Sequence, residues 1–499
     1  MDILSNLNLG FQVALGVQNV AYCFLGVLLG TAVGVLPGIG PVTTVAMLLP
    51  ISFTLPPESA LILLAGIYYG AQYGGSTTAI LVNIPGEASS VVTTIDGHKM
   101  AVMGRAGPAL GIAAIGSFFA GCVSTLLVSF AAPPLAALAL QFGPAEYFSL
   151  MVCGLVAAIV LAHGSVTKAV AMVLIGLTLG LAGTDINSGI RRFTFDMRGL
   201  ADGVEFVALS MGIYGLAEVA YNLQKKEQAA DRVQKIGSVW PSLADLKFST
   251  PSILRGTALG SILGVLPGGG ALLAAFAAYT LEKKVAKRPR HFGQGDIRGV
   301  AAPEAANNAG AQTSFIPMLT LGIPANPTMA MMIGALMIHG ISPGPTVMTE
   351  RPAMFWGIVA SMWIGNLMLV VLNLPLVGLW VRLLRIPYQY LFPAIVVFCC
   401  IGTYTVNRNL FDVYVMAFFA VFGYLCLKLE CEPAPLILGF VLGPMMEENL
   451  RRTLLMSRGE FSIFLTEKIS LIFLVVAAIM LVILAAPVVR RKREEAMRE

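Results

Sequence analysis

The motif Gly34-Val35-Leu36-Pro37-Gly38-Ile39-Gly40 constrains the fold more than any other feature, because it returns as Gly264-Val265-Leu266-Pro267-Gly268-Gly269-Gly270. Proline and closely spaced glycines interrupt a helix, yet both copies lie within strongly apolar sequence. Two such interruptions indicate a duplicated unit whose backbone is broken at matching places. In a membrane protein, a matching pair of Gly/Pro-interrupted segments is the best pointer in the sequence to a binding site.

The composition is that of a membrane protein. Of the 499 residues, 57% are hydrophobic and only 12% are charged, and the mean hydropathy is +0.81. A soluble domain carries about 25% charged residues. Apolar runs long enough to cross a bilayer recur along the whole chain, so we predict an all-α polytopic membrane protein with about 11–13 transmembrane helices and additional re-entrant pieces.

Basic residues are unevenly distributed along the chain. No Lys or Arg precedes Lys99, and twelve of the 32 lie between Lys225 and Arg298. Basic clusters beside spans mark the cytoplasmic side, so the net charge of +5 reports topology and not nucleic-acid binding. We predict a first membrane repeat over 1–222, a cytoplasmic linker over 223–250, a second membrane repeat over 251–464, and a final transmembrane helix with a basic cytoplasmic tail over 465–499.

Short apolar legs flank each copy of the motif, at 20–33 and 41–54 and again at 252–263 and 271–281. Legs of about 10–14 residues are too short to span and fit a re-entrant hairpin with the glycines at its tip. Both flanks of the second copy are strongly basic, whereas the flanks of the first copy contain no basic residue. We therefore expect two hairpins that enter from opposite faces, which makes an inverted-topology repeat.

A second matching pair of motifs follows the hairpins. Gly70-Ala71-Gln72 corresponds to Gly310-Ala311-Gln312, and Ile84-Pro85 corresponds to Ile323-Pro324. Each Ile-Pro ends a long apolar run and is followed by small or turn residues, so we predict one helix in each repeat that is broken within the membrane. Half-helix N-termini at such breaks present N–H groups to anions, and half-helix C-termini present carbonyls to cations.

The predicted substrate site combines the two motif tips and the two helix breaks with nearby hydroxyl and amide side chains. A merely structural turn is the alternative at the tips, and helix packing is the alternative for the hydroxyls. The candidate substrate-binding residues are Gly34, Pro37, Gly38, Gly40, Thr43, Thr44, Ser76, Thr77, Asn83, Pro85 and Gly86 in the first half, and Pro267, Gly268, Gly269, Gly270, Gln312, Pro324 and Asn326 in the second half.

A candidate cation site follows the second hairpin. Glu304, Asn307 and Asn308 are spaced i, i+3 and i+4, so they share one helix face. A carboxylate with two amides offers oxygen ligands to Na⁺ or an acceptor to a proton. The alternative is that Pro303 and Glu304 begin a helix, where a carboxylate stabilises the helix dipole.

Motifs of common enzymes are absent from the sequence. It has no Gly-x-x-x-x-Gly-Lys-Ser/Thr phosphate loop, no His-Glu-x-x-His pair and no Gly-x-Ser-x-Gly elbow. The seven cysteines lie mostly in apolar runs without zinc-ligand spacing. We therefore predict no catalytic residues, no metal site and no cofactor other than a coupling ion, Na⁺ or H⁺.

The chain resembles the large membrane subunit of tripartite tricarboxylate transporters, the TctA family. The resemblance implies a multi-pass secondary transporter of bacterial inner membranes, driven by an Na⁺ or H⁺ gradient. It also implies two protein partners, a periplasmic solute-binding protein that delivers a carboxylate and a small four-helix membrane subunit. The matching stretches cover nearly the whole chain in order: Gly34–Pro41, Tyr69–Gly86, Asp96-Gly97-His98, Arg192-Phe193-Thr194-Phe195, Gly264–Gly270, Gly295–Asn308, Leu321–Pro324, His339–Pro345 and Gly443–Leu450.

Two departures from the family pattern bear on the substrate. Ile323-Pro324-Ala325-Asn326-Pro327 stands where the family commonly has Ile-Pro-Gly-Ser, and Gln312-Thr313-Ser314-Phe315 replaces a more Gly/Ala-rich run. If this break contacts the ligand, the substrate need not be citrate. We expect an importer of tricarboxylates or related organic carboxylates, and the alternatives are an intramembrane enzyme or a passive anion channel.

Overall fold

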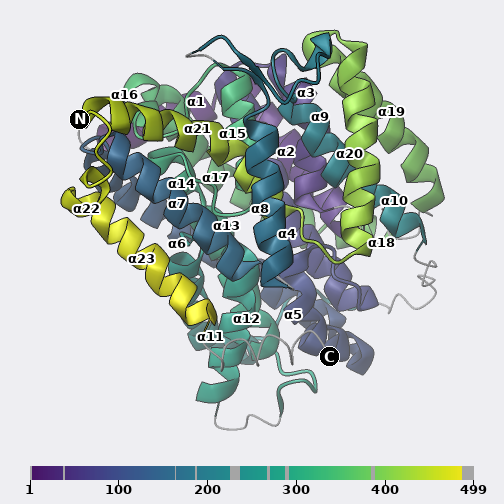
Figure 1. Ribbon diagram of the computed structural model, residues 1–499. Coiled ribbons are helices and arrows are strands. Elements are labelled where there is room, and N and C mark those ends of the chain that lie inside the picture. The colour runs from purple at the N-terminus through teal and green to yellow at the C-terminus, as the bar shows by residue number, and fades with distance from the viewer. Residues whose placement is uncertain are drawn as a thin grey trace.

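The computed structural model describes residues 3–36, 40–162, 165–185, 188–224, 236–266, 270–286, 291–383 and 388–485. These residues form helices almost throughout, and their only strands are the short antiparallel pair β1 (Gly183–Thr184) and β2 (Arg191–Arg192) (Figure 1). The predicted all-α fold is confirmed.

The first half contains these helices: α1 (Ile3–Ala14), α2 (Val17–Val35), α3 (Pro41–Phe53), α4 (Pro57–Val82), η1 (Ala88–Ser90), α5 (Val91–Thr93), η2 (Thr94–His98), η3 (Ala101–Arg105), α6 (Ala106–Ala139), α7 (Pro144–Leu161), α8 (Val166–Gly180), η4 (Arg198–Leu200), α9 (Phe206–Ser210), η5 (Met211–Leu216) and α10 (Ala217–Gln224). The second half contains α11 (Leu243–Leu263), α12 (Gly270–Val285), α13 (Arg298–Thr313), α14 (Phe315–Leu321), α15 (Pro327–Ile338), α16 (Thr346–Glu350), α17 (Pro352–Asn373), α18 (Val377–Leu383), α19 (Tyr388–Asn407), α20 (Leu410–Lys428), α21 (Ala434–Met456), α22 (Ile463–Thr466) and α23 (Lys468–Ala485).

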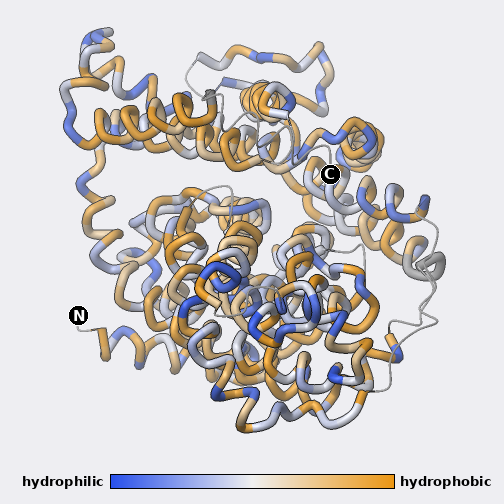
Figure 2. The backbone as a smooth tube through the Cα atoms, turned by 90° about the horizontal axis from the view of Figure 1, so that it is seen from below, coloured by the Kyte–Doolittle hydropathy of each residue, from blue (hydrophilic) through white to orange (hydrophobic). Residues whose placement is uncertain are grey.

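Six helical segments among the described residues are long and apolar enough to cross a membrane, and five shorter apolar helices accompany them. The predicted number of about 11–13 crossings stays a prediction. Outward faces are apolar as well, and hydrophobic colour follows nearly every helix in Figure 2. On α20, for example, Tyr414, Phe418 and Val421 are each more than 60% exposed. Such a surface suits contact with lipid and would be unfavourable in water.

Glycines join the first helix of each hairpin to the helix that follows the hairpin, which are α2 and α4 in the first repeat and α11 and α13 in the second. A Cβ on Gly30 of α2 would lie 2.3 Å from the carbonyl oxygen of Ile67 in α4, and a Cβ on Gly260 of α11 would lie 2.3 Å from that of Ala306 in α13. Only glycine permits this approach of two backbones. We call these residues the glycine ladders: Gly26, Gly30 and Gly34 against Leu63, Ile67 and Ala71, and Gly256, Gly260 and Gly264 against Ala302, Ala306 and Gly310.

The ladders give the direction of each helix. Residue numbers rise together along α2 and α4, so these helices are parallel, and the hydrogen bond from Ser59 to Asn19 (2.6 Å) joins their first turns. The same register makes α11 and α13 parallel. Between the two repeats, the order of the contacts along the helices is reversed. Ser76 of α4 contacts Glu304 of α13, whereas Gln72, which is earlier in α4, and Asn307, which is later in α13, both contact Ser89. The two repeats therefore run in opposite directions.

Contacts between the repeats are reciprocal. In the first repeat α6 packs on α11 and α13, and in the second repeat α17 packs on α2 and α4. Likewise α3 contacts α15, while α12 contacts η1 and α5. A two-fold relation between the repeats produces reciprocal contacts of this kind. The division of the chain at 222, 250 and 464 stays a prediction.

The hairpins differ from expectation in the length of one leg. The legs α3 and α12 are short, at 13 and 16 residues, but α2 and α11 have 19 and 21 residues. The prediction of short first legs was wrong, because the helix continues through neighbouring polar residues such as Asp245 that the apolar runs excluded. The end of α2 nevertheless lies inside the protein, because Gly34 packs against Gly75, well before the end of α4.

Both predicted helix breaks are present. Helix α4 ends at Asn83 in the left-handed conformation (φ 60°), and α14 ends at Gly322 (φ 71°). A left-handed residue commonly ends a helix, and Pro85 and Pro324 follow because proline cannot continue one. Helix α15 then restarts with Pro327 in its first turn, where a missing N–H costs nothing.

Candidate functional site

The first helix break is built from tightly packed backbone. Gly86 approaches Gly34 and Gly75 so closely that a Cβ on Gly86 would lie 1.9 Å from the Gly34 carbonyl oxygen. The predicted site residues Gly34 and Gly86 are thus brought together with no room for a side chain. Glu87 follows and caps η1 through reciprocal contacts with Ser90.

A polar cluster lies beside this break and joins the two repeats. The Ser89 hydroxyl lies 2.9 Å from Gln72 Oε1 and 2.9 Å from Asn307 Oδ1, and it also contacts the Glu87 carboxylate. Asn307 Nδ2 donates to Glu87 at 3.3 Å. All these side chains are buried. The predicted cation-site residue Asn307 therefore faces a carboxylate from the other repeat.

Glu304 forms the second half of this polar region. Its carboxylate accepts hydrogen bonds from Ser76 (2.5 Å) and from Thr93, and its side chain is only 1% exposed. Asn308 Nδ2 donates to Ser117 of α6 at 2.7 Å. Glu304 lies well inside α13, which begins at Arg298, so the alternative that it starts a helix was wrong.

The two buried carboxyl groups have no basic partner in the described part of the chain. Among the ion pairs formed by described residues, none involves Glu87 or Glu304. An ionised carboxylate inside a membrane protein is costly unless it is paired, hydrogen-bonded or bound to a cation. The site therefore favours a positively charged ligand, either a metal cation held by oxygen atoms or a proton.

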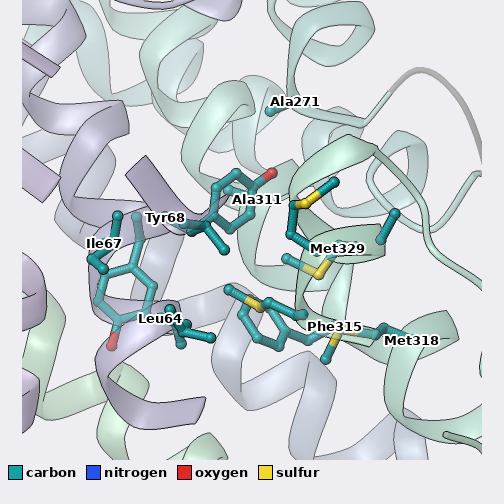
Figure 3. Packing of buried hydrophobic residues seen from close by; sticks show 14 of the residues in the cluster. Leu64, Ile67, Tyr68, Ala271, Ala311, Phe315, Met318 and Met329 are labelled. Carbon is teal, nitrogen blue, oxygen red and sulfur yellow. The ribbon is translucent and has the colours of Figure 1, made fainter. Parts of the chain in front are cut away.

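The second helix break carries amides instead of a carboxylate. Asn326 Oδ1 caps α15 by accepting from Met329 N (3.0 Å), and its Nδ2 donates to the Tyr68 hydroxyl of the first repeat (3.0 Å). Figure 3 shows Tyr68 among apolar residues of the second repeat, including Ala311 and Met329. Both amide atoms of the fully buried Gln312 lack a hydrogen-bond partner among the described residues.

The structure describes only part of the two motif tips. Pro37, Gly38, Pro267, Gly268 and Gly269 lie outside the described residues. Gly40 precedes the first turn of α3, and Gly270 begins α12 with φ 39° and lies near the Asn326 side chain.

The hydroxyls near the first tip bond to protein atoms. Thr43 donates to Tyr214 O (2.9 Å) and contacts Glu218, while Thr44 donates to Gly40 O. Thr77 lies one turn of α4 after Tyr73 and lines a small cavity. The assignment of the tip, break and hydroxyl residues to substrate binding stays a prediction.

Sequence reasoning missed several residues of this region. Glu87 was treated as part of a turn, although a carboxylate directly after Pro85-Gly86 in an apolar region was a usable signal. Ser117 and Thr93 gave no signal, because their roles depend on partners roughly two hundred positions away. No group of three or more His, Cys, Asp or Glu in the described part of the chain is arranged to hold a metal ion.

A separate charged network closes the outer loop that contains β1 and β2. Arg192 pairs with Glu447 (2.7 Å), and Arg451 pairs with Asp185 (3.0 Å). Hydrogen bonding to Glu447 raises the pKa of Arg192 further above its usual value. These residues fix the outer loop against α21.

Comparison with known proteins identifies the family. The sequence profile of the tripartite tricarboxylate transporter TctA family matches residues 20–438. The chain belongs to the TctA family. This TctA-family protein is 58% identical over 495 residues to an uncharacterized 52.8 kDa protein in the TAR-I ttuC' 3' region of Agrobacterium vitis, and the match covers 99% of each chain.

A second relative from Agrobacterium vitis is an uncharacterized protein in the TAR-II ttuC' 3' region. It is 57% identical over 236 residues, which is 47% of this TctA-family chain and 98% of the relative. No solved structure matches the chain. The family and the apolar helices together make this a multi-pass membrane protein of a transport system.

Proposed function

We propose that this protein is the large transmembrane subunit of a secondary, ion-gradient-driven importer that takes tricarboxylates or related organic carboxylates from a periplasmic binding protein. Membership of the TctA family supports the transport class. The observation that carries the mechanism is the meeting of two oppositely directed broken helices around buried polar side chains. Irregular backbone at membrane depth is tolerated where it is buried in protein or lines a substrate path.

The carboxylate would bind between the two breaks. The N-terminus of α15, with its positive dipole end, and the amides of Asn326 and Gln312 suit an anion. The Nε2 donor of Gln312 has no partner among described residues, so a ligand carboxylate that accepts a hydrogen bond from it would satisfy a group that is otherwise costly to bury.

The coupling cation would bind on the other side of the same region. Glu304, with Asn307 and Asn308 on the same face of α13, supplies oxygen atoms, and no described basic side chain pairs with it. A cation there would compensate the charge of the incoming carboxylate, which links the movements of the two ligands.

The protein would lie in the bacterial inner membrane together with a small four-helix membrane subunit. Helices α5, α11 and α12 lie at the lower end of the molecule in Figure 1, and β1 and β2 lie at the upper end. Lys99 and Arg105 follow α5 in the chain, and Lys283 and Lys284 lie in the last turn of α12. Basic loops face the cytoplasm, so the outer loop would face the periplasm and its binding protein.

Transport by the reconstituted complex tests this proposal. Proteoliposomes that contain the protein and both partners should accumulate labelled citrate or another carboxylate only when an Na⁺ or H⁺ gradient and the loaded binding protein are present. Dissipating the gradient with an ionophore is the control. Flux that continues without a gradient and without the binding protein would indicate a channel and would contradict the proposal, as would an assembled complex that shows no uptake under either gradient.

A further inference from the structure

A small cavity lies between α4, α6 and α17, next to Glu304 but formed by other residues. Its volume of about 10 Å³ is close to what one water molecule needs, so it suits a single small particle. Three apolar side chains from α6 form one wall. The polar lining residues are Tyr73, Ser76 and Thr77 of α4, Ser117 of α6 and Asn373 of α17.

All five polar lining residues are buried, with at most 5% of each side chain exposed. Two of their oxygen atoms, the Tyr73 hydroxyl and Asn373 Oδ1, have no hydrogen-bond partner among the described residues. A buried polar atom without a partner is destabilising, and two that line one cavity point to a ligand that the cavity receives.

The hydrogen atoms of the lining groups are mostly directed elsewhere. Ser76 donates to Glu304 Oε2 (2.5 Å), and Ser117 donates to the Glu304 carbonyl oxygen (3.4 Å). Thr77 donates to Tyr73 O (3.5 Å), and Asn373 Nδ2 donates to Leu369 O (2.9 Å). Ser117 also accepts a hydrogen bond from Asn308 Nδ2 (2.7 Å), and the other oxygen lone pairs of these groups are left for the cavity. Only the Tyr73 hydroxyl keeps an unused donor hydrogen, so most of the lining groups offer acceptors. Such a lining suits a cation better than a water molecule, which needs acceptors and donors together.

The charge around the cavity also favours a cation. The Glu304 carboxylate lies directly behind Ser76, and the described residues that line the cavity include no basic side chain. Neutral oxygen ligands with one carboxylate behind them suit a monovalent ion, because Ca²⁺ and Mg²⁺ sites use directly coordinating carboxylates or retained waters. The apolar wall of Leu110, Ala113 and Ala114 leaves little space for such waters.

We propose that this cavity binds one dehydrated Na⁺ ion, held by the oxygen atoms of Tyr73, Ser76, Thr77, Ser117 and Asn373 and balanced by Glu304. The inference rests on the proposed function, because it places the coupling ion beside Glu304 in this cavity, and not directly on the oxygen atoms of Asn307 and Asn308. Since α4, α6 and α17 come from both repeats, the ion would hold the two repeats together in one of the transport states.

Direct binding of ²²Na⁺ to the purified protein in lipid nanodiscs tests the site. Tyr73→Phe removes one hydroxyl, and Asn373→Leu removes the unpartnered amide oxygen; each should weaken Na⁺ binding by about tenfold or more. Tyr69→Phe and Asn366→Leu are matched controls. Tyr69 and Asn366 lie on the same helices and also have an unpartnered buried oxygen, but neither lines the cavity. Both controls should bind Na⁺ like the unmodified protein.

The outcomes separate the site from the transport proposal. If Tyr73→Phe folds with an unchanged melting temperature and binds Na⁺ like the unmodified protein, the cavity is not the site, even if uptake is driven by Na⁺. Failure of the unmodified protein to bind Na⁺ also overturns the site and leaves a proton as the coupling ion. If the two cavity variants lose Na⁺ binding while the complete complex transports no carboxylate, the site stands and the proposed function falls.

Discussion

At the first helix break, Glu87 caps the following helix and shares Ser89 with Gln72 and Asn307. At the second break, Asn326 takes the capping position, and Gln312, the counterpart of Gln72, has no partner among the described residues. The backbone plan is the same in both places, with parallel helices joined by a glycine ladder and a left-handed residue before a proline. Duplication has therefore kept the scaffold while the side chains at the breaks have diverged toward a carboxylate on one side and amides on the other.

The largest effect is expected where the two repeats are most alike. Gly30→Leu and Gly260→Leu would each drive a side chain into a facing carbonyl, so each should destabilise the protein by more than about 3 kcal/mol. The yield of monodisperse protein and the melting temperature in detergent measure this. Gly378→Leu is the control, because nothing lies within 4 Å of a Cβ at Gly378. Similar behaviour of Gly260→Leu and the control would contradict the close approach of α11 and α13.

The next largest effect is expected on Na⁺-driven uptake, in which the two buried carboxylates, Glu304 and Glu87, should differ. Glu304→Gln keeps the size of the side chain but removes the charge behind Ser76, so Na⁺-driven uptake should fall by about 10- to 100-fold. Glu87→Gln should retain its Na⁺ dependence, because Glu87 faces Ser89 and Asn307 instead of the cavity. The Na⁺ concentration for half-maximal uptake is the readout. An unchanged value in Glu304→Gln would remove Glu304 from the coupling site.

A smaller effect is expected at the two corresponding glutamines, Gln72 and Gln312. Gln72→Leu breaks the hydrogen bond with Ser89 and should cost about 1–3 kcal/mol of stability. Gln312→Leu removes an amide without a protein partner, so the stability should stay the same or rise while carboxylate binding weakens. Thermal unfolding with and without substrate distinguishes the two variants. Full carboxylate affinity in Gln312→Leu would show that this amide has no part in the substrate site.

The smallest expected effect concerns the base of the first hairpin. Ser59→Ala removes the hydrogen bond to Asn19 between the first turns of α2 and α4, and because that pair is only partly buried, about 0.5–1 kcal/mol of stability should be lost. Thr54→Val, which alters an exposed hydroxyl nearby, is the control for the melting temperature. A loss no larger than that of the control would mean that the glycine ladder alone holds these helices.

The sequence was sufficient to predict the main features of the fold. Apolar composition, the repeated Gly-Val-Leu-Pro-Gly motif and the two Ile-Pro pairs led to an all-α membrane protein with hairpins and broken helices. The glycine ladders could have been predicted too, because Gly26, Gly30 and Gly34 recur every four residues, a spacing typical of close helix pairs.

The chemistry of the site was less accessible from the sequence. Glu304 stood out because it shares a helix face with two amides. Glu87 carries a local signal, a carboxylate directly after Pro85-Gly86, but its partner Asn307 lies 220 positions away. Asn373 lies at the end of an ordinary apolar helix, and only packing against α4 and α6 brings it to the cavity. Long-range partners of this kind leave no local pattern in the sequence.

The glycine ladders also indicate which parts of the molecule can move. Backbone locked against backbone leaves no freedom for α2 to slide along α4, or for α11 to slide along α13, because every step would force a carbonyl into a Cα. The boundary between α4 and α13 is different in kind, since its hydroxyls and amides can exchange partners at little cost. Each repeat should thus move as a rigid body. The hydrogen bonds between the two repeats can be exchanged as these rigid bodies move relative to each other.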